Sequence, residues 1–405
     1  MKMKIASDYL IRRCVCGLAV LLLSATDLFA QQADSNGLAT DITVSLLDVA
    51  PGYSIYTAHG HCALRLQCPS AGLDLSFTYG LDDTVENRIS FFTGKGMGEY
   101  SAAHTDDYLK DYAGEGRQVK EYELNFSIDQ KRHLWKLLDD ELSRGAFRPY
   151  NYLKTNCSTM CAHAVVRALS GDANIVYEST APVLNGTYRD LVRQVSSHRP
   201  WVDFFWNTLL GAEGEERGKI EDKLSPSLLV ETWQHTAIVD SLGTSRPMLV
   251  DNAGRVVVEG DDGLRTTWFT PTVCFALLLL FVVLLTIAEY RGRLLRLAHG
   301  VDVLLFVLQT VIGFIICYIT FFSSHVGAAG NWYAIPCNPV PFVCWLLFRH
   351  RKGYRRLFLV YFVVLCLFML LTPFVAQLDL PHCLVAAILA VRCLANGRWK
   401  MKDEK

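Results

Sequence analysis

The alternation of apolar and polar residues predicts four β-strands between residue 31 and about residue 265. They cover residues 42–46, 61–66, 73–79 and 119–126. In the second strand His61 shares one face with Ala63, while Leu64 and Leu66 share the other with Cys62. Because the two leucines should face the core, His61 is expected to face elsewhere and to be available to a cleft.

Helical spacing of apolar residues follows two capping signals. Ser127 and Gln130 form a capping box, and the helix that it opens should end at Gly145. Asn156 is a suitable N-cap for a second helix over residues 157–169. Residues 247–258, with a turn in the middle, resemble a β-hairpin. Together these elements predict one mixed α/β domain over residues 31–265.

Apolar residues dominate the last third of the chain, where they form five spans. The spans cover residues 268–288, 302–322, 332–348, 357–376 and 380–395. A transmembrane helix needs ~20 residues, so the third and fifth spans are short. The pattern predicts a transmembrane domain of five helices over residues 266–405.

The basic residues predict how these helices are oriented. Lys and Arg gather after the first span (291–296), after the third (349–356) and after the fifth (392–402), and they are missing from loops 323–331 and 377–379. Since basic loops stay in the cytoplasm, the domain before residue 268 lies outside. Residues 1–30, with a basic start and a short apolar core, independently resemble a secretory signal peptide. We therefore expect a multi-pass protein of the bacterial cytoplasmic (inner) membrane with a periplasmic N-terminal domain.

Charge and cysteine content narrow the function classes. A net charge of −1 gives no reason to expect nucleic acid as a partner. Residues 31–265 contain Cys62, Cys68, Cys157 and Cys161 without the spacing of a zinc site, so neither a metal nor a cofactor is predicted. Cys62 and Cys68 fit either a disulfide or two separate core cysteines.

Cys157 is the candidate nucleophile. At the first turn of a helix, the macrodipole and the free N–H groups favour a thiolate and can hold an oxyanion. A small buried cysteine would fit this position equally well.

His61 is the candidate general base, and Asn156 and Ser158 are candidates to orient the pair or to hold the oxyanion. On strand 73–79, Asp74 shares a face with Ser76 and Thr78, and any of the three could orient the imidazole.

Three polar residues at the membrane edge are candidates for contact with a lipid head group or a peptide. His325 and Asn331 lie in the external loop 323–331, and His382 begins the last span. Polar residues at a membrane interface need have no other role.

The order of the motifs carries a family resemblance. Gly60–Arg65 reads Gly-His-x-Ala-Leu-Arg, Tyr79-Gly80 ends a strand, and Tyr150–Thr159 reads Tyr-x-Tyr-x4-Asn-Cys-Ser-Thr. A Leu-Ser-Pro-x-Leu-Leu turn at 224–229 and the multi-span C-terminus follow. The chain thus resembles the Lnb family of lipoprotein N-acyltransferases over nearly its whole mature length. Its histidine-first order also resembles permuted papain-like domains of the NlpC/P60 type, which implies an α/β (α+β) extracytoplasmic domain followed by an α-helical transmembrane domain.

The resemblance implies acyl transfer from a membrane phospholipid to the α-amino group of the N-terminal diacylglyceryl-cysteine of lipoproteins. Cys157 would carry the acyl group as a thioester, and His61 would relay protons. Cys62, directly after the histidine, departs from the hydroxyl or small residue expected there. Because it lies on the opposite strand face, Cys62 does not conflict with the dyad, and we expect it to matter more for folding than for chemistry.

Two other classes of function fit the residues. A membrane-anchored cysteine peptidase or amidase acting on cell-wall peptides would use the same dyad, with water as the final acceptor. A membrane-anchored binding module without chemistry would be unaffected by loss of the Cys157 thiol. Five membrane spans favour a lipid or lipid-anchored substrate over a soluble one.

Overall fold

The computed structural model describes residues 40–81, 89–91, 93–178, 186–216, 225–264, 267–325, 327–348 and 355–398. The expected signal peptide (1–30) and most of the basic loop at 349–356 lie outside these residues. The described residues divide into two units: residues 40–42 with 68–73, and the described residues of 43–67 and 74–398. In the first unit, the Asp41 carboxylate accepts hydrogen bonds from the Ser70 N–H (2.8 Å) and hydroxyl (2.7 Å). These bonds hold the short 3-10 turn η2 (Pro69–Ala71).

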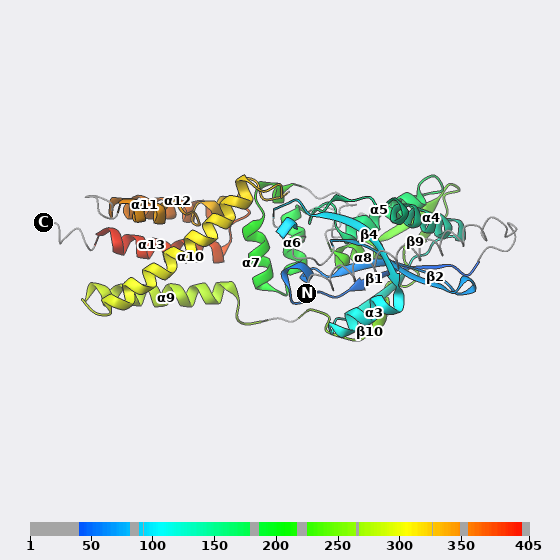
Figure 1. Cartoon of the computed structure of the whole chain (residues 1–405), viewed down its shortest axis with the longest axis horizontal. Helices are drawn as coiled ribbons and strands as arrows, with labels where there is room; N and C mark the ends of the chain where they lie inside the picture. The colour runs from blue at the N-terminus through cyan, green and yellow to red at the C-terminus, as the bar shows by residue number, and fades with distance from the viewer. Residues whose placement is uncertain are drawn as a thin grey trace, which may run out of the picture. The chain divides into compact units, whose positions relative to one another are not determined.

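A seven-stranded sheet forms the centre of the N-terminal domain, in the order β10-β5-β1-β2-β3-β4-β6 (Figure 1). The strands are β1 (Thr43–Val49), β2 (His61–Cys68), β3 (Leu73–Gly80), β4 (Met97–His104), β5 (Val119–Glu123), β6 (Arg148–Pro149) and β10 (Arg255–Val258). β1 lies antiparallel between β2 and β5, with His61 opposite Val49. The four strands predicted from alternation are therefore present, with ends shifted by a few residues.

Helices cover both faces of the sheet. On one face, Tyr108 of α3 (Thr105–Gly114) packs against Leu47, Ala63 and Val119. On the other face, α5 (Cys157–Leu169) brings Cys161 to 3.8 Å from Cys62, measured between the sulfurs. Next to α5 lie α4 (Ile128–Arg144) and α8 (Pro226–Gln234). The N-terminal domain is a mixed α/β structure, and its papain-like permutation stays a prediction.

The predicted hairpin at 247–258 is wrong. A second sheet has the order β7-β8-β9, with β7 (Ala173–Tyr177), β8 (Thr236–Asp240) and β9 (Ser245–Pro247). β9 pairs with β8 in this small sheet, whereas β10 pairs with β5 in the large one. Between them the chain changes sheets: Met248 N–H bonds to the Thr236 carbonyl, and Val250 N–H bonds to the Glu123 carbonyl. The chain therefore changes sheets near Met248, and the turn at 252–254 lies between two segments that both pair along β5.

Two helices lead from the α/β domain toward the membrane helices. These are α6 (Tyr188–Ser196) and α7 (Pro200–Leu209), and α7 carries four aromatic residues within its ten. Trp206 of α7 packs with Leu153, Leu191 and Leu228 of the N-terminal domain. On its other side, Phe204 contacts the rings of Phe275 and His382 in the C-terminal region.

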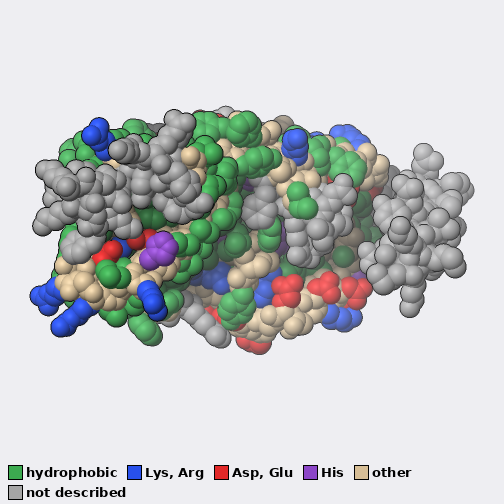
Figure 2. Space-filling model, turned by 60° about the vertical axis from the view of Figure 1, so that its left-hand side comes forward, with side chains coloured by type: hydrophobic (Ala, Val, Ile, Leu, Met, Phe, Trp, Pro, Cys, Tyr) green, Lys and Arg blue, Asp and Glu red, His purple; other side chains and the backbone are tan. Residues whose placement is uncertain are grey.

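The C-terminal region is helical. It contains α9 (Pro271–Tyr290), α10 (Leu295–Phe321), α11 (Val340–Phe348), α12 (Arg355–Leu371) and α13 (Leu380–Arg398). Among the described residues, four helices are long and apolar enough to cross a membrane: α9, α10, α12 and α13. α11 has nine residues before the chain leaves the described part, so a fifth span stays a prediction. Figure 2 shows hydrophobic side chains gathered over these helices.

A buried ionic cluster joins three of these helices. Arg392 of α13 is fully buried and binds the Asp302 carboxylate of α10 at 2.5 and 2.9 Å. A nitrogen of the same guanidinium lies 2.9 Å from the Glu289 carboxylate of α9. Charges inside a membrane domain are tolerated when they pair with one another, so this cluster fixes the three helices together.

Candidate active site

Cys157 is the first residue of α5, as predicted. The Asn156 side chain accepts a hydrogen bond from the Thr159 N–H at 3.0 Å, and the Thr159 hydroxyl accepts one from the Asn156 N–H at 2.8 Å. This reciprocal cap fixes the helix start. The Asn156 amide also donates to the Tyr152 carbonyl (2.8 Å), which holds the preceding loop against the helix. Asn156 therefore positions the nucleophile through the backbone.

The first-turn N–H groups give the site its anion-binding capacity. The Thr159 and Met160 N–H groups bond to Asn156. Among the described residues, this leaves the N–H groups of Cys157 and Ser158 as the first-turn donors beside the sulfur. The Ser158 hydroxyl is fully buried and lies 3.7 Å from the Cys62 sulfur. The Ser158 side chain thus faces the thiols, and its backbone is the part suited to an oxyanion.

His61 begins β2 directly after a sharp turn. Gly60 has a φ of +82°, and a Cβ there would lie 2.6 Å from the Val49 carbonyl oxygen. Only glycine fits this turn readily, so the strand starts at His61 and His59 lies outside it. His61, through its charge and a hydrogen bond, contributes to lowering the pKa of Cys157.

Thr78 determines which His61 nitrogen is free to accept a proton. Its hydroxyl donates to the Cys62 carbonyl at 2.9 Å and lies 2.7 Å from His61 Nε2. Because the one hydroxyl hydrogen points to the carbonyl, Thr78 must accept the Nε2 proton. Nδ1 is then the basic nitrogen available to the Cys157 thiol.

The other two residues on that strand face have different partners. Asp74 binds Arg65 at 2.5 and 2.8 Å, and Arg65 also binds Glu121 at 3.0 Å. The Ser76 hydroxyl lies 2.9 Å from that of Thr105. Of the three candidates on β3, it is therefore Thr78, and not Asp74, that contacts the imidazole.

Cys62 lies close to the nucleophile. A hydrogen bond from its thiol, together with the charge and hydrogen bond of His61, lowers the pKa of Cys157 well below its usual range, although burial opposes this. The same thiol lies 3.7 Å from the Ser158 hydroxyl and 3.8 Å from the Cys161 sulfur. Burial raises the pKa of Cys62 itself, so Cys62 keeps the proton that it donates. Cys62 lies near Cys157 because α5 packs on the strand face that carries Cys62. That Cys62 matters more for folding than for chemistry stays a prediction.

Cys62 and Cys68 do not form a disulfide. Both are free, buried thiols at opposite ends of one strand. Six residues of extended chain span about 20 Å, whereas a disulfide needs Cα atoms within about 7 Å. The alternative of two core cysteines is therefore the correct one.

The three membrane-edge candidates contact α7 or its surroundings. Asn331 donates to the carbonyls of Thr208 (2.8 Å) and Leu209 (3.2 Å). His382 is fully buried, bonds to Asp379 through Nδ1, and lies 3.1 Å from the Thr208 hydroxyl through Nε2. These two residues fasten the end of α7 to the membrane helices. His325 instead lines an apolar pocket, with its ring 5.2 Å from that of Phe91.

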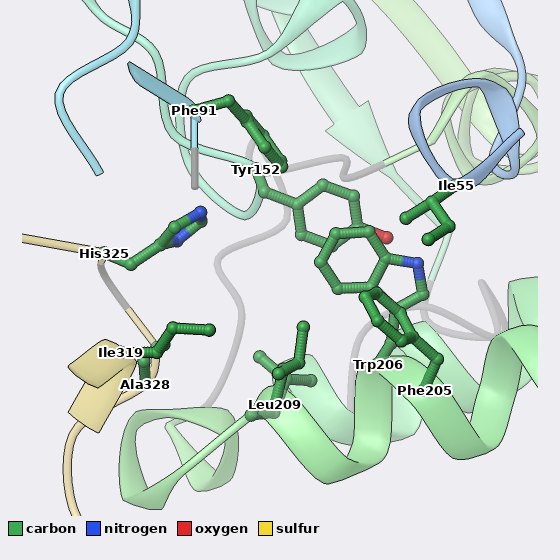
Figure 3. Close-up of a pocket in the computed structure, with 11 residues that line it drawn as sticks. Ile55, Phe91, Tyr152, Phe205, Trp206, Leu209, Ile319, His325 and Ala328 are labelled. Atoms are coloured by element: carbon green, nitrogen blue, oxygen red, sulfur yellow. The ribbon is translucent and has the colours of Figure 1, made fainter. Parts of the chain in front are cut away.

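This pocket was not foreseen from the sequence. Figure 3 shows Tyr152 and Trp206 side by side in it. Their stacked rings have centroids 4.1 Å apart. Ile55, Phe205 and Leu209 complete the same wall. The aromatic run at 201–206 was its available signal, but aromatic residues on a short helix are more often ordinary core residues.

Comparison with known families agrees with this architecture. Residues 30–194 match the family model described as the Lnb N-terminal periplasmic domain, and residues 264–404 match that described as the Lnb transmembrane domain. No curated protein and no solved structure matches the chain. The chain belongs to the Lnb family, as a multi-pass protein of the bacterial inner membrane whose N-terminal domain lies in the periplasm.

Proposed function

We propose that this protein is a lipoprotein N-acyltransferase that moves an acyl chain from a membrane phospholipid to the α-amino group of a lipoprotein's diacylglyceryl-cysteine. The single observation that carries the proposal is the position of Cys157 at the start of α5, beside Cys62 and His61, in a domain attached to membrane helices. We take residues 1–30 as the signal peptide, 31–265 as the catalytic domain and 266–405 as a membrane domain of five helices.

The first half-reaction forms a thioester. The Cys157 thiolate attacks an ester carbonyl of the phospholipid, and the N–H groups of Cys157 and Ser158 stabilise the oxyanion. The carbon–oxygen bond of the ester breaks, and the leaving alkoxide takes a proton from the His61 imidazolium. The products are acyl-Cys157, neutral His61 and a lysophospholipid.

The second half-reaction forms the amide. The unprotonated α-amine of the lipoprotein attacks the thioester carbonyl, and His61 Nδ1 accepts the amine proton. The carbon–sulfur bond breaks, and Cys157 leaves as a thiolate whose low pKa makes it a good leaving group. The cycle ends with the thiolate and imidazolium with which it began, so no cofactor is required.

The test combines labelled phospholipid, a diacylglyceryl lipopeptide and the purified full-length protein in vesicles. We expect label on the enzyme as a hydroxylamine-sensitive adduct and then on the peptide amine. Cys157→Ser should abolish transfer, and His61→Ala should lower it by about 10²- to 10⁴-fold, as expected for loss of a general base. Cys68→Ser, which changes a buried thiol at the far end of β2, is the matched control and should leave transfer unchanged.

Three outcomes would contradict the proposal. Transfer at the wild-type rate by Cys157→Ser would exclude Cys157 as the nucleophile. Label ending in free fatty acid, with the peptide cut, would favour the cysteine peptidase or amidase. If Cys157→Ser and His61→Ala behave like the wild-type protein and no labelled adduct forms on the enzyme, a binding module would be favoured.

A further inference from the structure

We propose that an apolar cavity between α7 and the membrane helices α9, α10 and α13 binds one acyl chain of the phospholipid donor. We further infer that Phe91 and Tyr150 guide this chain from the cavity to Cys157. Both inferences rest on the acyl transfer proposed above and name the place where its donor is held.

The cavity has the size and lining of a hydrocarbon site. Its volume is about 630 Å³, within the range of about 300–1,000 Å³ that is typical of ligand pockets. The walls include Phe205, Leu209, Leu278, Leu308, Ile312 and Leu389. No charged side chain lines it among the described residues. Such a wall favours an alkyl chain, because a polar ligand would leave its own groups without partners.

The position of the cavity makes a membrane lipid the natural occupant. Its α10 wall runs from Leu305 to Ile316, in the middle of a candidate span that extends from Leu295 to Phe321. Leu308 and Ile315 are 49% and 51% exposed, so this wall faces the surroundings of the helix as well as the cavity. At this depth the surroundings are lipid chains, and one of them can enter sideways.

A second cavity, of about 30 Å³, adjoins this site on the side of the N-terminal domain. Ile55, Phe205, Trp206 and Leu209 line both cavities. Beyond this shared wall, the second cavity reaches Tyr152, Phe91 and His325, whose side chains surround it in Figure 3. The two cavities therefore share a wall that runs from membrane depth to the loop before Cys157.

Aromatic contacts continue from the second cavity to the nucleophile. The ring of Phe91 lies 6.1 Å from that of Tyr150. Tyr150 begins the loop that leads to Cys157. In this loop Tyr152, which also lines the second cavity, accepts a hydrogen bond through its carbonyl from the amide of Asn156 (2.8 Å), the residue before Cys157. We therefore place an acyl chain attached to Cys157 alongside Tyr150 and Phe91, directed toward the two cavities.

The transferred chain fits this route better than the chains of the acceptor do. To form the thioester, the donor chain must bring its carbonyl carbon to the Cys157 sulfur. The lipoprotein reacts through its α-amine alone, and its glyceride chains can stay in the bilayer throughout. We therefore assign the cavity to the phospholipid chain.

Matched tryptophan substitutions on α10 test the assignment through acyl-chain selectivity. Leu308 lines the cavity, whereas Leu304, one turn earlier and 58% exposed, does not. In vesicles with equal amounts of lauroyl and palmitoyl phospholipid, Leu308→Trp should raise the ratio of lauroyl to palmitoyl on the peptide about tenfold, as expected for a shortened hydrocarbon pocket. Leu304→Trp should keep the wild-type ratio. Ile315→Trp, nearer the periplasmic end of the cavity, should lower the transfer of both chains.

Photocrosslinking gives a readout that does not need catalysis. In the Cys157→Ser variant, phosphatidylglycerol with a diazirine near the end of one chain should label residues around Leu308. The labelling should be lost with Leu308→Trp and kept with Leu304→Trp. A lipopeptide carrying the same diazirine in its glyceride chains is the second arm, and its labelling of the cavity in place of the phospholipid would overturn the assignment.

The two proposals fail in different ways. If the wild-type protein transfers chains but Leu308→Trp changes neither selectivity nor crosslinking, the cavity assignment is wrong and the acyl transfer stands. If the phospholipid probe labels the cavity but no chain reaches the peptide amine, the acyl-chain site stands and the proposed transfer fails.

Discussion

At the residue scale, the proposed chemistry depends on a hydroxyl that fixes the orientation of one imidazole. Thr78 accepts the Nε2 proton of His61 and is itself held by the Cys62 carbonyl. A threonine can do this because its hydroxyl donates one hydrogen bond and accepts others. The arrangement presents Nδ1 to Cys157 without a third ionisable residue. Asp74 could not take this role, because both of its oxygens bind Arg65.

Thr78→Val should lower the rate of acyl transfer by about tenfold to a hundredfold, as for other partners that orient a functional histidine. The shape of the side chain is kept, but the acceptor for Nε2 is lost. The fall should lie in kcat, with little change in KM, measured in the vesicle assay. Thr78→Ser keeps the hydroxyl and should restore most of the rate. If Thr78→Ser lowers the rate of acyl transfer as much as Thr78→Val does, the hydroxyl does not orient His61 and Thr78 has only a packing role.

Cys62 provides a second prediction at this scale. Because its hydrogen bond lowers the pKa of Cys157, Cys62→Ala should raise that pKa. In the wild type, the Cys157 thiolate persists as the pH falls below about 8.5, the usual thiol pKa. Alkylation of the Cys157 peptide by iodoacetamide, followed by mass spectrometry against pH, should therefore show a midpoint that moves upward in Cys62→Ala.

Cys161→Ala is the control for this measurement, since Cys161 is the buried neighbour of Cys62 on the same helix as Cys157. It should shift the midpoint less. If both variants keep the wild-type midpoint, the Cys62 thiol plays no part in activating Cys157, and the original expectation that Cys62 matters mainly for folding would hold.

At the element scale, local signals in the sequence were sufficient for some features and insufficient for others. The capping residues Ser127 and Asn156 located the starts of α4 and α5, because a cap depends on residues within one turn. Gly60 similarly marked the start of β2. The hairpin prediction failed because two segments close in sequence pair with strands from different sheets. The partner of His61 was left open for the same reason, since strand register depends on tertiary pairing.

The turn before β2 carries an acid-sensitive contact. His59 is buried, bonds to the Tyr152 hydroxyl through Nδ1 and lies 2.8 Å from the Ser196 hydroxyl. Burial, with the nearby Arg199 charge, lowers the pKa of His59 to about 3. The unfolded chain takes up this proton below about pH 6.5, whereas the folded protein does not until about pH 3. Stability is therefore lost as the pH falls through this window.

His59 alone should cost about 2 kcal/mol of unfolding free energy at about pH 5 relative to neutral pH. We expect His59→Gln to be less stable at neutral pH, because two buried hydroxyls lose their partner, but to lose less stability on acidification. Denaturant unfolding in detergent at both pH values measures this difference. The exposed His104→Gln is the control and should keep the wild-type pH dependence. If His59→Gln loses as much unfolding free energy on acidification as the wild type does, His59 is not the source of the acid sensitivity.

At the scale of the whole molecule, the contacts of α7 join the two family domains. Its end is fastened by Asn331 and His382, and backbone bonds from Gly211 and Ala212 to the carbonyls of Gly327 (2.6 Å) and Ala329 (2.7 Å) continue the contact. A Cβ at Gly211 would lie 2.0 Å from the Ala329 carbonyl oxygen, so only glycine allows this approach. The apolar cavities lie beside this junction, which is therefore also the place where a lipid chain can pass between the domains.

This junction requires the N-terminal domain and loop 323–331 to lie on the same side of the membrane. Gly211 and Ala212 of the N-terminal domain bond to Gly327 and Ala329 of that loop. The distribution of Lys and Arg, which involves other residues, places the same loop outside the cytoplasm. The backbone bonds place the N-terminal domain on the same side of the membrane as loop 323–331, and the distribution of Lys and Arg places that loop outside. These two observations are independent and agree with each other.

Reporter fusions test this orientation directly. A reporter active only in the cytoplasm should be active when fused after Lys405 or within the basic loop at 349–356, and silent when fused at Gly263. Alkaline phosphatase, which is active only outside, should give the opposite pattern and serves as the control for expression. The C-terminal result also tests the fifth helix, because four spans would place both ends of the domain on one side. Cytoplasmic activity at Gly263 would contradict the charge argument, and phosphatase activity at Lys405 would show that α11 does not cross the membrane.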